Sequence, residues 1–324
     1  MKYNRKYKYV IFGSGWDLYK ISYADVSLLS DAVYISDEII RNNYLRRLHL
    51  GKINRIITLP FKDLWNKFLF INPFQDNDNL CFIFFTSWIA FDKETGFISY
   101  LKQKYPNSKF VWFLQDLYYT HPYPVDDFDL VLSYDKNDCE KYGFIYHHTV
   151  FSQNNRVESN KQYESDVLFV GKAKDRLFQI YSSYEKLSQA GLHCRFFLLD
   201  VPKEERLYPD KIHYLDKIMP YSWVLENVAS TKCILEIMQA RAQGYTYRLW
   251  ESITFDKKLL TNNDSLEKDN LFYSKDYISI IKDEINNDNI NFILNEESYI
   301  NPHKNQLSPV IMLDFVDKIL NKPC

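Results

Sequence analysis

The stretch that decides the fold is CILEIMQARAQGYTYRLWESITFDKKLLTNN, which spans residues 233–263. Its first apolar run predicts a buried strand over residues 232–238, and a loop that contains a glycine follows. The next residues predict a helix over 248–255 and a second strand over 258–261. A strand, a helix and a strand in this order are typical of a parallel α/β sheet.

The same alternation extends through the rest of the chain, which indicates a doubly wound α/β fold. Helices are predicted at residues 175–190, 221–229 and 309–320, the last with Ser308 as its cap and Pro309 at its first position. Further short apolar runs predict strands over residues 8–12, 33–35, 56–59, 80–85, 109–114, 129–133, 166–170, 194–199 and 211–214.

A polar segment without apolar periodicity divides the chain. The 324 residues suit two domains of ordinary size better than one. We therefore predict two Rossmann-like domains, over residues 1–152 and 165–305, joined by a linker over 153–164. Residues 306–324 would form a helix that packs back on the first domain.

Composition and charge narrow the class of protein. Hydrophobic residues at 46% and charged residues at 25% are ordinary globular values, and a net charge of −2 argues against a nucleic-acid-binding domain. Five scattered cysteines without a CxxC pair predict reduced thiols, with neither a zinc site nor disulfides. No apolar segment is long enough for a signal peptide or a membrane span, so we expect a cytoplasmic protein.

The loop and helix start of residues 243–251 carry the clearest chemical signal. The helix would bring Arg248 and Glu251 within one turn of its amino end, where free N–H groups and the helix dipole favour phosphates. A carboxylate one turn into the helix can accept two hydrogen bonds from the vicinal hydroxyls of a ribose. The alternative interpretation is a surface ion pair between Arg248 and Glu251 at spacing i, i+3.

This segment resembles the nucleotide-binding region of GT-B glycosyltransferases, especially bacterial enzymes of lipopolysaccharide and capsule assembly. The resembling residues are Gln243, Gly244, Thr246, Arg248 and Glu251, followed by the strand KKLLTNN over residues 257–263. The resemblance implies a GT-B architecture, in which two Rossmann-like domains with parallel sheets face each other across a cleft. It also implies that Glu251 holds the ribose and that Thr246 with its neighbouring backbone meets the diphosphate. Because residue 243 is Gln and not Glu, the common retaining motif is incomplete.

Two weaker segments extend the predicted nucleotide-sugar site. In VLFVGKAKDR, residues 167–176, a strand ends at Gly171 and is followed by Lys172 and Arg176, whose charges would suit a diphosphate leaving group. In the GT-B enzymes a loop before a helix receives the base through backbone groups, and Met219 and Tyr221 resemble it. A proline at a helix start with a packed tyrosine is the alternative.

The first domain offers candidates for the catalytic base. An inverting transfer needs one base for the acceptor hydroxyl, and Asp17, Asp116 and His121 each follow a predicted strand. Each of the three could instead be a cap or turn residue. The first glycine turn, residues 13–15, lacks the third glycine of a dinucleotide fingerprint and would line the acceptor side.

Metal and membrane signals are limited to local patterns. The D-x-D strings at residues 76–78 and 127–129 are typical of turns, so we predict no essential metal and no cofactor. Residues 41–68 hold seven cations against one acid among large apolar residues. This stretch could rest on an anionic membrane surface at the inner face of the cell membrane, or form a solvated helical face.

The prediction is a metal-independent glycosyltransferase that moves a sugar from a nucleotide donor, a UDP-sugar, to a polysaccharide or lipid-linked oligosaccharide. Two alternatives stay open. A sugar-nucleotide epimerase can share the two-domain architecture, and a noncatalytic nucleotide-binding partner could carry a degenerate site.

Overall fold

The structure is a computed structural model, and it describes residues 4–38, 66–67, 69–75, 77–118, 123–154, 157–239, 244–269, 271–297 and 299–322. The chain divides into two compact units. Unit 1 comprises Met1–Asn154 with Ser308–Cys324, and unit 2 comprises Asn155–Leu307. The first boundary therefore falls within the polar segment 153–164, and the last helix belongs to unit 1.

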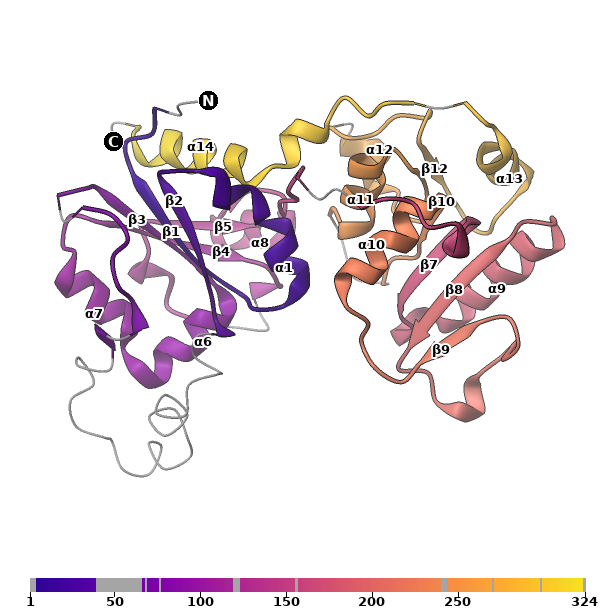
Figure 1. Cartoon of the computed structure of the whole chain (residues 1–324), viewed down its shortest axis with the longest axis horizontal. Coiled ribbons are helices and arrows are strands. Elements are labelled where there is room, and N and C mark those ends of the chain that lie inside the picture. The colour runs from indigo at the N-terminus through magenta and orange to yellow at the C-terminus, as the bar shows by residue number, and fades with distance from the viewer. Residues whose placement is uncertain are drawn as a thin grey trace. The chain divides into compact units, whose positions relative to one another are not determined.

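Unit 1 is a six-stranded parallel sheet in the order β2-β1-β3-β4-β5-β6 (Figure 1). The predicted strands are found where expected, except for that over residues 56–59, which lies outside the described residues. The order reverses between β1 and β3. The elements are β1 (Lys8–Gly13), α1 (Asp17–Ser22), β2 (Ala32–Ser36), β3 (Leu80–Phe85), α6 (Thr86–Thr95), α7 (Phe97–Lys104), β4 (Lys109–Leu114), β5 (Leu130–Ser133), α8 (Lys136–Tyr142), β6 (Ile145–Tyr146) and α14 (Pro309–Leu320).

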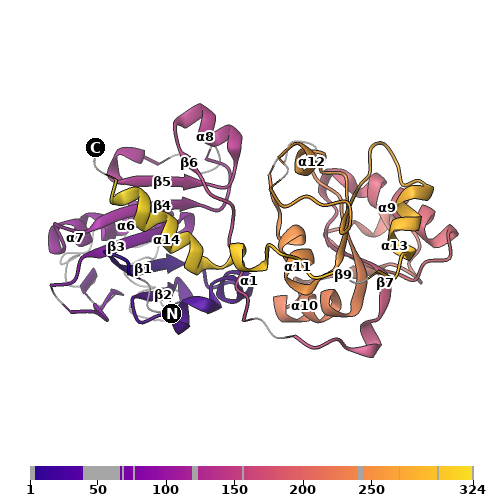
Figure 2. The ribbon, with the colours of Figure 1, turned by 90° about the horizontal axis from the view of Figure 1, so that it is seen from above.

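The side chains of each strand alternate between the two faces of this sheet, and each face is covered and forms its own apolar cluster. In β1, Tyr9 and Ile11 join the cluster that includes Leu313 of α14, whereas Val10 and Phe12 pack with aromatic residues of the opposite face. Figures 1 and 2 show α14 along one face of the sheet, while α6 and α7 cover the other. The predicted helix over residues 309–320 is confirmed, and Ser308 accepts from the Val310 N–H at 3.3 Å as its cap.

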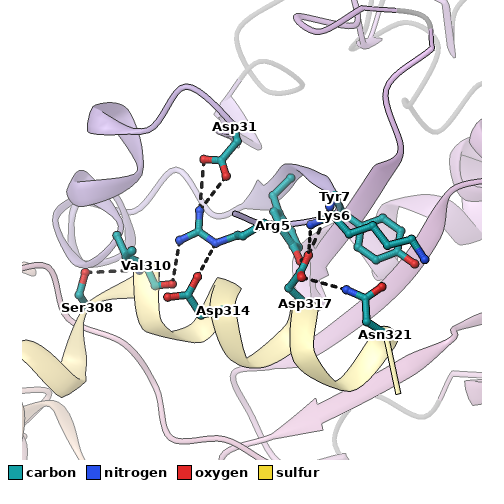
Figure 3. A network of polar contacts seen from close by, with 10 residues as sticks. Arg5, Lys6, Tyr7, Asp31, Ser308, Val310, Asp314, Asp317 and Asn321 are labelled. Atoms are coloured by element: carbon teal, nitrogen blue, oxygen red, sulfur yellow. Dashed lines mark hydrogen bonds and ion pairs between the residues drawn. The ribbon is translucent and has the colours of Figure 1, made fainter. Parts of the chain in front are cut away.

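Helix α14 is fastened to unit 1 by a buried arginine (Figure 3). The Arg5 guanidinium donates to Asp31 at 3.0 Å, to Asp314 at 2.6 Å and to the Val310 carbonyl at 3.2 Å. Its side chain is only 2% exposed. Asp317 adds a second fastening, because it accepts from two backbone N–H groups of residues 6 and 7. The amino and carboxyl ends of the chain thus form one polar network.

A buried histidine under α14 makes stability depend on pH. His147 packs against Phe113 and Phe315, and its Nδ1 donates to the His148 carbonyl at 2.6 Å. Burial lowers the pKa of His147 to about 3, well below the value near 6.5 in an unfolded chain. Below that unfolded pKa the unfolded state binds the proton more readily, so stability is lost as pH falls.

We therefore expect His147 to reduce the free energy of unfolding by about 2 kcal/mol between pH 7.5 and pH 5. Urea unfolding of the wild type and of His147→Phe across this range measures the effect. The phenylalanine variant removes the titrating group, so its stability should fall less steeply. Equal slopes for both proteins would show that His147 is not the responsible group.

Unit 2 repeats the design with a six-stranded parallel sheet in the order β12-β11-β10-β7-β8-β9. Helix α9 packs over one face of the sheet, while α10 contacts β7 and β10, and α11 contacts β10 and β11. The order reverses between β7 and β10. The elements are β7 (Ser165–Lys172), α9 (Leu177–Gln189), β8 (Cys194–Leu199), β9 (His213–Leu215), α10 (Tyr221–Ser230), β10 (Thr231–Glu236), α11 (Tyr247–Phe255), β11 (Lys258–Thr261), α12 (Ser265–Asp269), β12 (Ile278–Ile280) and α13 (Asn287–Leu294).

Most predicted elements of unit 2 are confirmed, with shifted ends. The helix predicted from residue 175 begins at Leu177, because Lys174–Arg176 forms a 3-10 turn in which Lys174 has a positive φ of 47°. The strand predicted over residues 232–238 ends at Glu236. No helix in the described part of the chain is both long and apolar enough to cross a membrane.

Candidate functional site

The two strands at which the order of the second sheet reverses end side by side, and Arg176 joins their ends. Its Nη1 donates to the Ile237 carbonyl just after β10, and its Nε and Nη2 donate to the Lys172 carbonyl at the end of β7. Gly171 lies beside the guanidinium, since an ideal Cβ there would be 3.4 Å from Arg176 Nη2. Open α/β sheets bind ligands at this kind of position.

A cavity of about 400 Å³ opens beside Arg176. Its lining comes from the turn after β7, the loop after β10 and the segment after β11. Besides Arg176 it includes a second cation, Lys268, and a set of side chains that can donate or accept hydrogen bonds. These are Asp175, Gln179, Gln239, Asn262, Asn263, Asp264 and Ser265. Lys268 pairs with Asp264 at 2.6 Å, so the cavity is polar and its lining carries two cations and two carboxylates.

The KKLLTNN strand shapes this cavity through its last two residues. Asn262 accepts from the Met238 N–H at 2.6 Å and so fixes the loop after β10. Asn263 donates to the Gly244 carbonyl at 2.9 Å and fixes the glycine before α11, whose φ of 103° is in the region that favours glycine. The resemblance included these asparagines without a role, and here they connect two loops.

Glu236 lies under these loops and was missed by the sequence analysis. It is 4% exposed and accepts hydrogen bonds from the hydroxyls of Thr246 and, at 2.5 Å, Thr261. Burial raises the pKa of Glu236, while the two hydroxyls and the nearby charges of Arg248 and Arg176 oppose the rise. Thr246 also accepts from the Arg248 N–H at 3.1 Å as the cap of α11. Its hydroxyl is therefore engaged within the protein, and the predicted contact of Thr246 and its neighbouring backbone with a diphosphate stays a prediction.

Glu251 forms a second buried carboxylate one turn into α11. It is 0% exposed, pairs with Arg248 and accepts from the Tyr221 hydroxyl at 2.7 Å. Burial raises the pKa of Glu251, and the charge of Arg248 opposes the rise. The predicted pair exists, but it is buried and not a surface ion pair. In this arrangement a ribose could reach Glu251 only after a neighbouring side chain moves.

The other described residues of unit 2 that were predicted for the site, Met219, Tyr221 and Lys172, are not among those that line the cavity. Tyr221 begins α10 and contacts Glu251, while Met219 is half-buried in the preceding loop. Lys172 is partly exposed and pairs with Asp200 at 2.8 Å, and it is not among the described residues that line the cavity. Gln243 lies outside the described residues.

In unit 1, the predicted base candidates follow the carboxyl ends of the first sheet. Asp17 begins α1 after β1, Asp116 follows β4, and both are exposed. His121 lies outside the described residues. At the same end of the sheet, Thr86 Oγ1, Ser87 Oγ and Gln115 Nε2 are buried and have no hydrogen-bond partner among the described residues. No local pattern in the sequence marks these three polar groups.

The glycine turn of unit 1 is closed by its own neighbours. The Tyr34 hydroxyl donates to the Ser14 carbonyl at 2.7 Å, and the Gly15 N–H donates to Asp37 at 2.7 Å. A Cβ on Gly13 would lie 2.2 Å from the Tyr34 hydroxyl, so only glycine fits there. This packing accounts for the glycine without a dinucleotide.

The structure describes one of the two D-x-D strings in full and only two residues of the basic stretch 41–68. Asp127 pairs with Lys102 at 2.9 Å and Asp129 with Lys109 at 2.7 Å, so both carboxylates have partners within the protein. Residue 76 lies outside the described residues, as do all residues of the stretch 41–68 except 66 and 67. The predicted membrane contact of this stretch stays a prediction.

Solved structures with similar architecture settle the fold. HepE from Anabaena, in complex with UDP and glucose, aligns over 97% of this chain and 99% of its own with a TM-score of 0.56 and 10% identity. An α-glucosyltransferase in complex with UDP-glucose and DNA containing an abasic site aligns over 96% and 93% with a TM-score of 0.53 and 12% identity. The chain has the GT-B fold.

Further comparisons bear on the same architecture. The trehalose-6-phosphate synthase OtsA aligns over 97% of this chain and 98% of its own, with a TM-score of 0.52 and 10% identity. No protein-family model matches the sequence, and a search of curated protein sequences gives no match. At identities this low, structural similarity shows the fold of the chain but not its activity.

Proposed function

We propose that the protein is a glycosyltransferase that moves a sugar from a UDP-sugar to a polysaccharide or lipid-linked oligosaccharide, without a metal ion. The observation that carries the proposal is the polar cavity beside Arg176, at the point where the strand order of the second sheet reverses. Two of the similar GT-B structures are complexes that contain UDP or UDP-glucose, which supports this choice of donor.

In the proposed donor complex, the diphosphate lies beside Arg176 and Lys268. Burial lowers the pKa of Arg176 and makes its charge costly, and the nearby charges of Glu236 and Asp175 offset only part of that cost. A diphosphate would offset that cost, and the developing charge on the leaving UDP would strengthen the interaction in the transition state. The ribose hydroxyls would bind Glu251 once Arg248 turns toward the phosphates.

The acceptor would be bound and deprotonated by residues of unit 1. We assign the base to Asp17, which follows β1, or to Asp116, which follows β4, and both side chains are exposed. The buried Thr86, Ser87 and Gln115 groups supply hydrogen-bonding capacity at the same end of the sheet. These atoms are enclosed in the structure, so an acceptor would reach them only after neighbouring side chains move.

The expected first result is stabilisation by the correct donor in a thermal-shift screen against UDP-, GDP-, CMP- and dTDP-sugars. A ligand at one hundred times its Kd stabilises the folded state by about 2.7 kcal/mol. Product analysis of the stabilising donor, with and without a glycan acceptor, then decides the reaction. Transfer or slow hydrolysis supports the proposal, interconversion without acceptor indicates an epimerase, and binding without turnover indicates a noncatalytic partner.

Arg176→Met is expected to weaken UDP binding by about ten- to hundredfold, the effect of losing one charge-assisted contact. Isothermal titration calorimetry measures the change. Lys174→Met is the matched control, because it removes a cation from the same turn and Lys174 is not among the described residues that line the cavity. Equal affinities for the wild type and Arg176→Met would show that the diphosphate binds elsewhere.

A further inference from the structure

A second cavity of about 620 Å³ lies in unit 2, away from the proposed donor site. It is lined by residues near the amino ends of β8 and β9, whereas the donor cavity follows the carboxyl ends of β7, β10 and β11. Strand β8 lies beside α9, as Figure 1 shows, and the last turn of α9 adds Ser188 to the lining. This second cavity has no role in the proposed transfer.

The charge of this pocket is one-sided. Its described lining includes Arg195, Lys211, His193 and His213, and no aspartate or glutamate. The nearby Asp166 accepts from the His193 backbone N–H at 2.8 Å, and its other oxygen is paired with Lys232 at 2.9 Å. The charge of this carboxylate is therefore already balanced outside the pocket, and the cations of the lining stay uncompensated.

The Arg195 guanidinium is held in place by aromatic rings and a hydrogen bond. Its Cζ lies 4.9 Å from the centre of the Tyr163 ring and 5.3 Å from that of Phe197, so two aromatic rings hold the guanidinium. Its Nη1 donates to the Gln162 carbonyl at 2.6 Å, and no ion pair joins it to any described residue. Of its five N–H donors, one is used in the hydrogen bonds of the described chain.

The rings around Arg195 also fix a histidine. His213 is stacked on Phe197 with ring centres 4.7 Å apart, and burial together with the charge of Arg195 lowers the pKa of His213. Arg195 and His213 thus share one aromatic surface, and the lowered pKa favours the neutral form of His213. An anion bound between them would satisfy the unused donors of the guanidinium and favour the protonated, donating form of the imidazole.

We propose that this pocket binds a phosphate group, carried by a phosphorylated small molecule or by a phospholipid headgroup. A held guanidinium, an ammonium group and two imidazoles without a carboxylate match a doubly charged oxyanion better than a single carboxylate. The volume is in the range of pockets that enclose small molecules. The proposal is independent of the glycosyltransferase assignment, because it uses neither Arg176 nor Glu251.

The test compares binding of two probes to the full chain and four variants. Calorimetry with inorganic phosphate detects a free ligand, and sedimentation with phosphatidylglycerol vesicles, against phosphatidylcholine vesicles, detects a headgroup. Arg195→Met should weaken binding by about tenfold or more, and Lys211→Met by about two- to fivefold. Lys275→Met, which removes an exposed cation of unit 2 outside the described lining, should leave binding unchanged.

Each outcome decides the proposal. Phosphate binding that depends on Arg195 and Lys211 supports a free phosphorylated ligand, and vesicle binding alone with the same dependence supports a lipid headgroup. Binding of neither probe, or binding that both pocket variants leave unchanged, would overturn the proposal. If Arg195→Met does not fold, the exposed Lys211→Met still gives the decision. Arg176→Met should retain this binding, which separates the pocket from the proposed donor site.

Discussion

Replacing Arg248 with methionine is expected to lower the free energy of unfolding by about 3–5 kcal/mol, because it leaves a buried carboxylate without its partner. Glu251 is 0% exposed, and Arg248 is its ion-pair partner. The Tyr221 hydroxyl remains as a hydrogen-bond donor, but it carries no charge. Urea unfolding at neutral pH measures the loss.

The pH dependence of this variant identifies the cause. Removal of Arg248 raises the already elevated pKa of Glu251 further, so the folded state would take up a proton more readily. Stability is then lost as pH rises above the unfolded pKa, and the variant should be closer to the wild type in acid. The double variant Arg248→Met, Glu251→Gln should recover part of the loss.

A surface pair provides the matched control for Arg248. Lys186 pairs with Glu284 at 3.5 Å, and both side chains are largely exposed. Lys186→Met should therefore change the stability by about 0–1 kcal/mol. If Arg248→Met costs no more than this control, the ion pair is not a buried element of the site.

Arg5→Met is expected to destabilise unit 1 by about 3–5 kcal/mol, because Asp31, Asp314 and the Val310 carbonyl would lose the guanidinium that donates to all three. Asp31 has a side chain that is only 14% exposed, so it would keep a poorly solvated charge. Asp314 is 39% exposed and would be solvated more easily. Methionine retains much of the apolar length of arginine, so the loss reports mainly on the polar network of Figure 3.

Thermal and urea unfolding with a tryptophan probe measure this effect. Lys20→Met is the control, because Lys20 pairs with Glu38 in a pair whose side chains are 39% and 45% exposed. That variant should lose about 0–1 kcal/mol. A similar small loss for Arg5→Met would show that the Arg5 contacts do not hold α14 on the sheet, and that apolar packing and the Asp317 hydrogen bonds do.

The strands with long apolar runs and the helix with a clear cap were predicted well from the sequence. Strands such as β3 and β4 are apolar runs of six residues, and the capped α14 was predicted with its observed bounds. The two strands that were missed, β6 and β12, have two and three residues, too few to show a period. Helix α13 was missed because its start depends on an asparagine capping box in a polar stretch.

The site was predicted less completely because its contacts join distant segments. Glu236 stands in an apolar run that reads as an ordinary strand, and its partners Thr246 and Thr261 come from other elements. The pairing of Arg248 with Glu251 followed from helical spacing, but its burial depends on Tyr221, thirty positions away in the chain. Local patterns therefore identified the segments, and packing decided which groups are accessible.

The measurement that tests the central claim most directly is a crystal structure of the chain with UDP. We expect the diphosphate within hydrogen-bond distance of Arg176 in the cavity after β7, β10 and β11, and the ribose hydroxyls on Glu251 with Arg248 displaced. UDP bound away from this cavity, or a cavity empty at saturating UDP, would contradict the account.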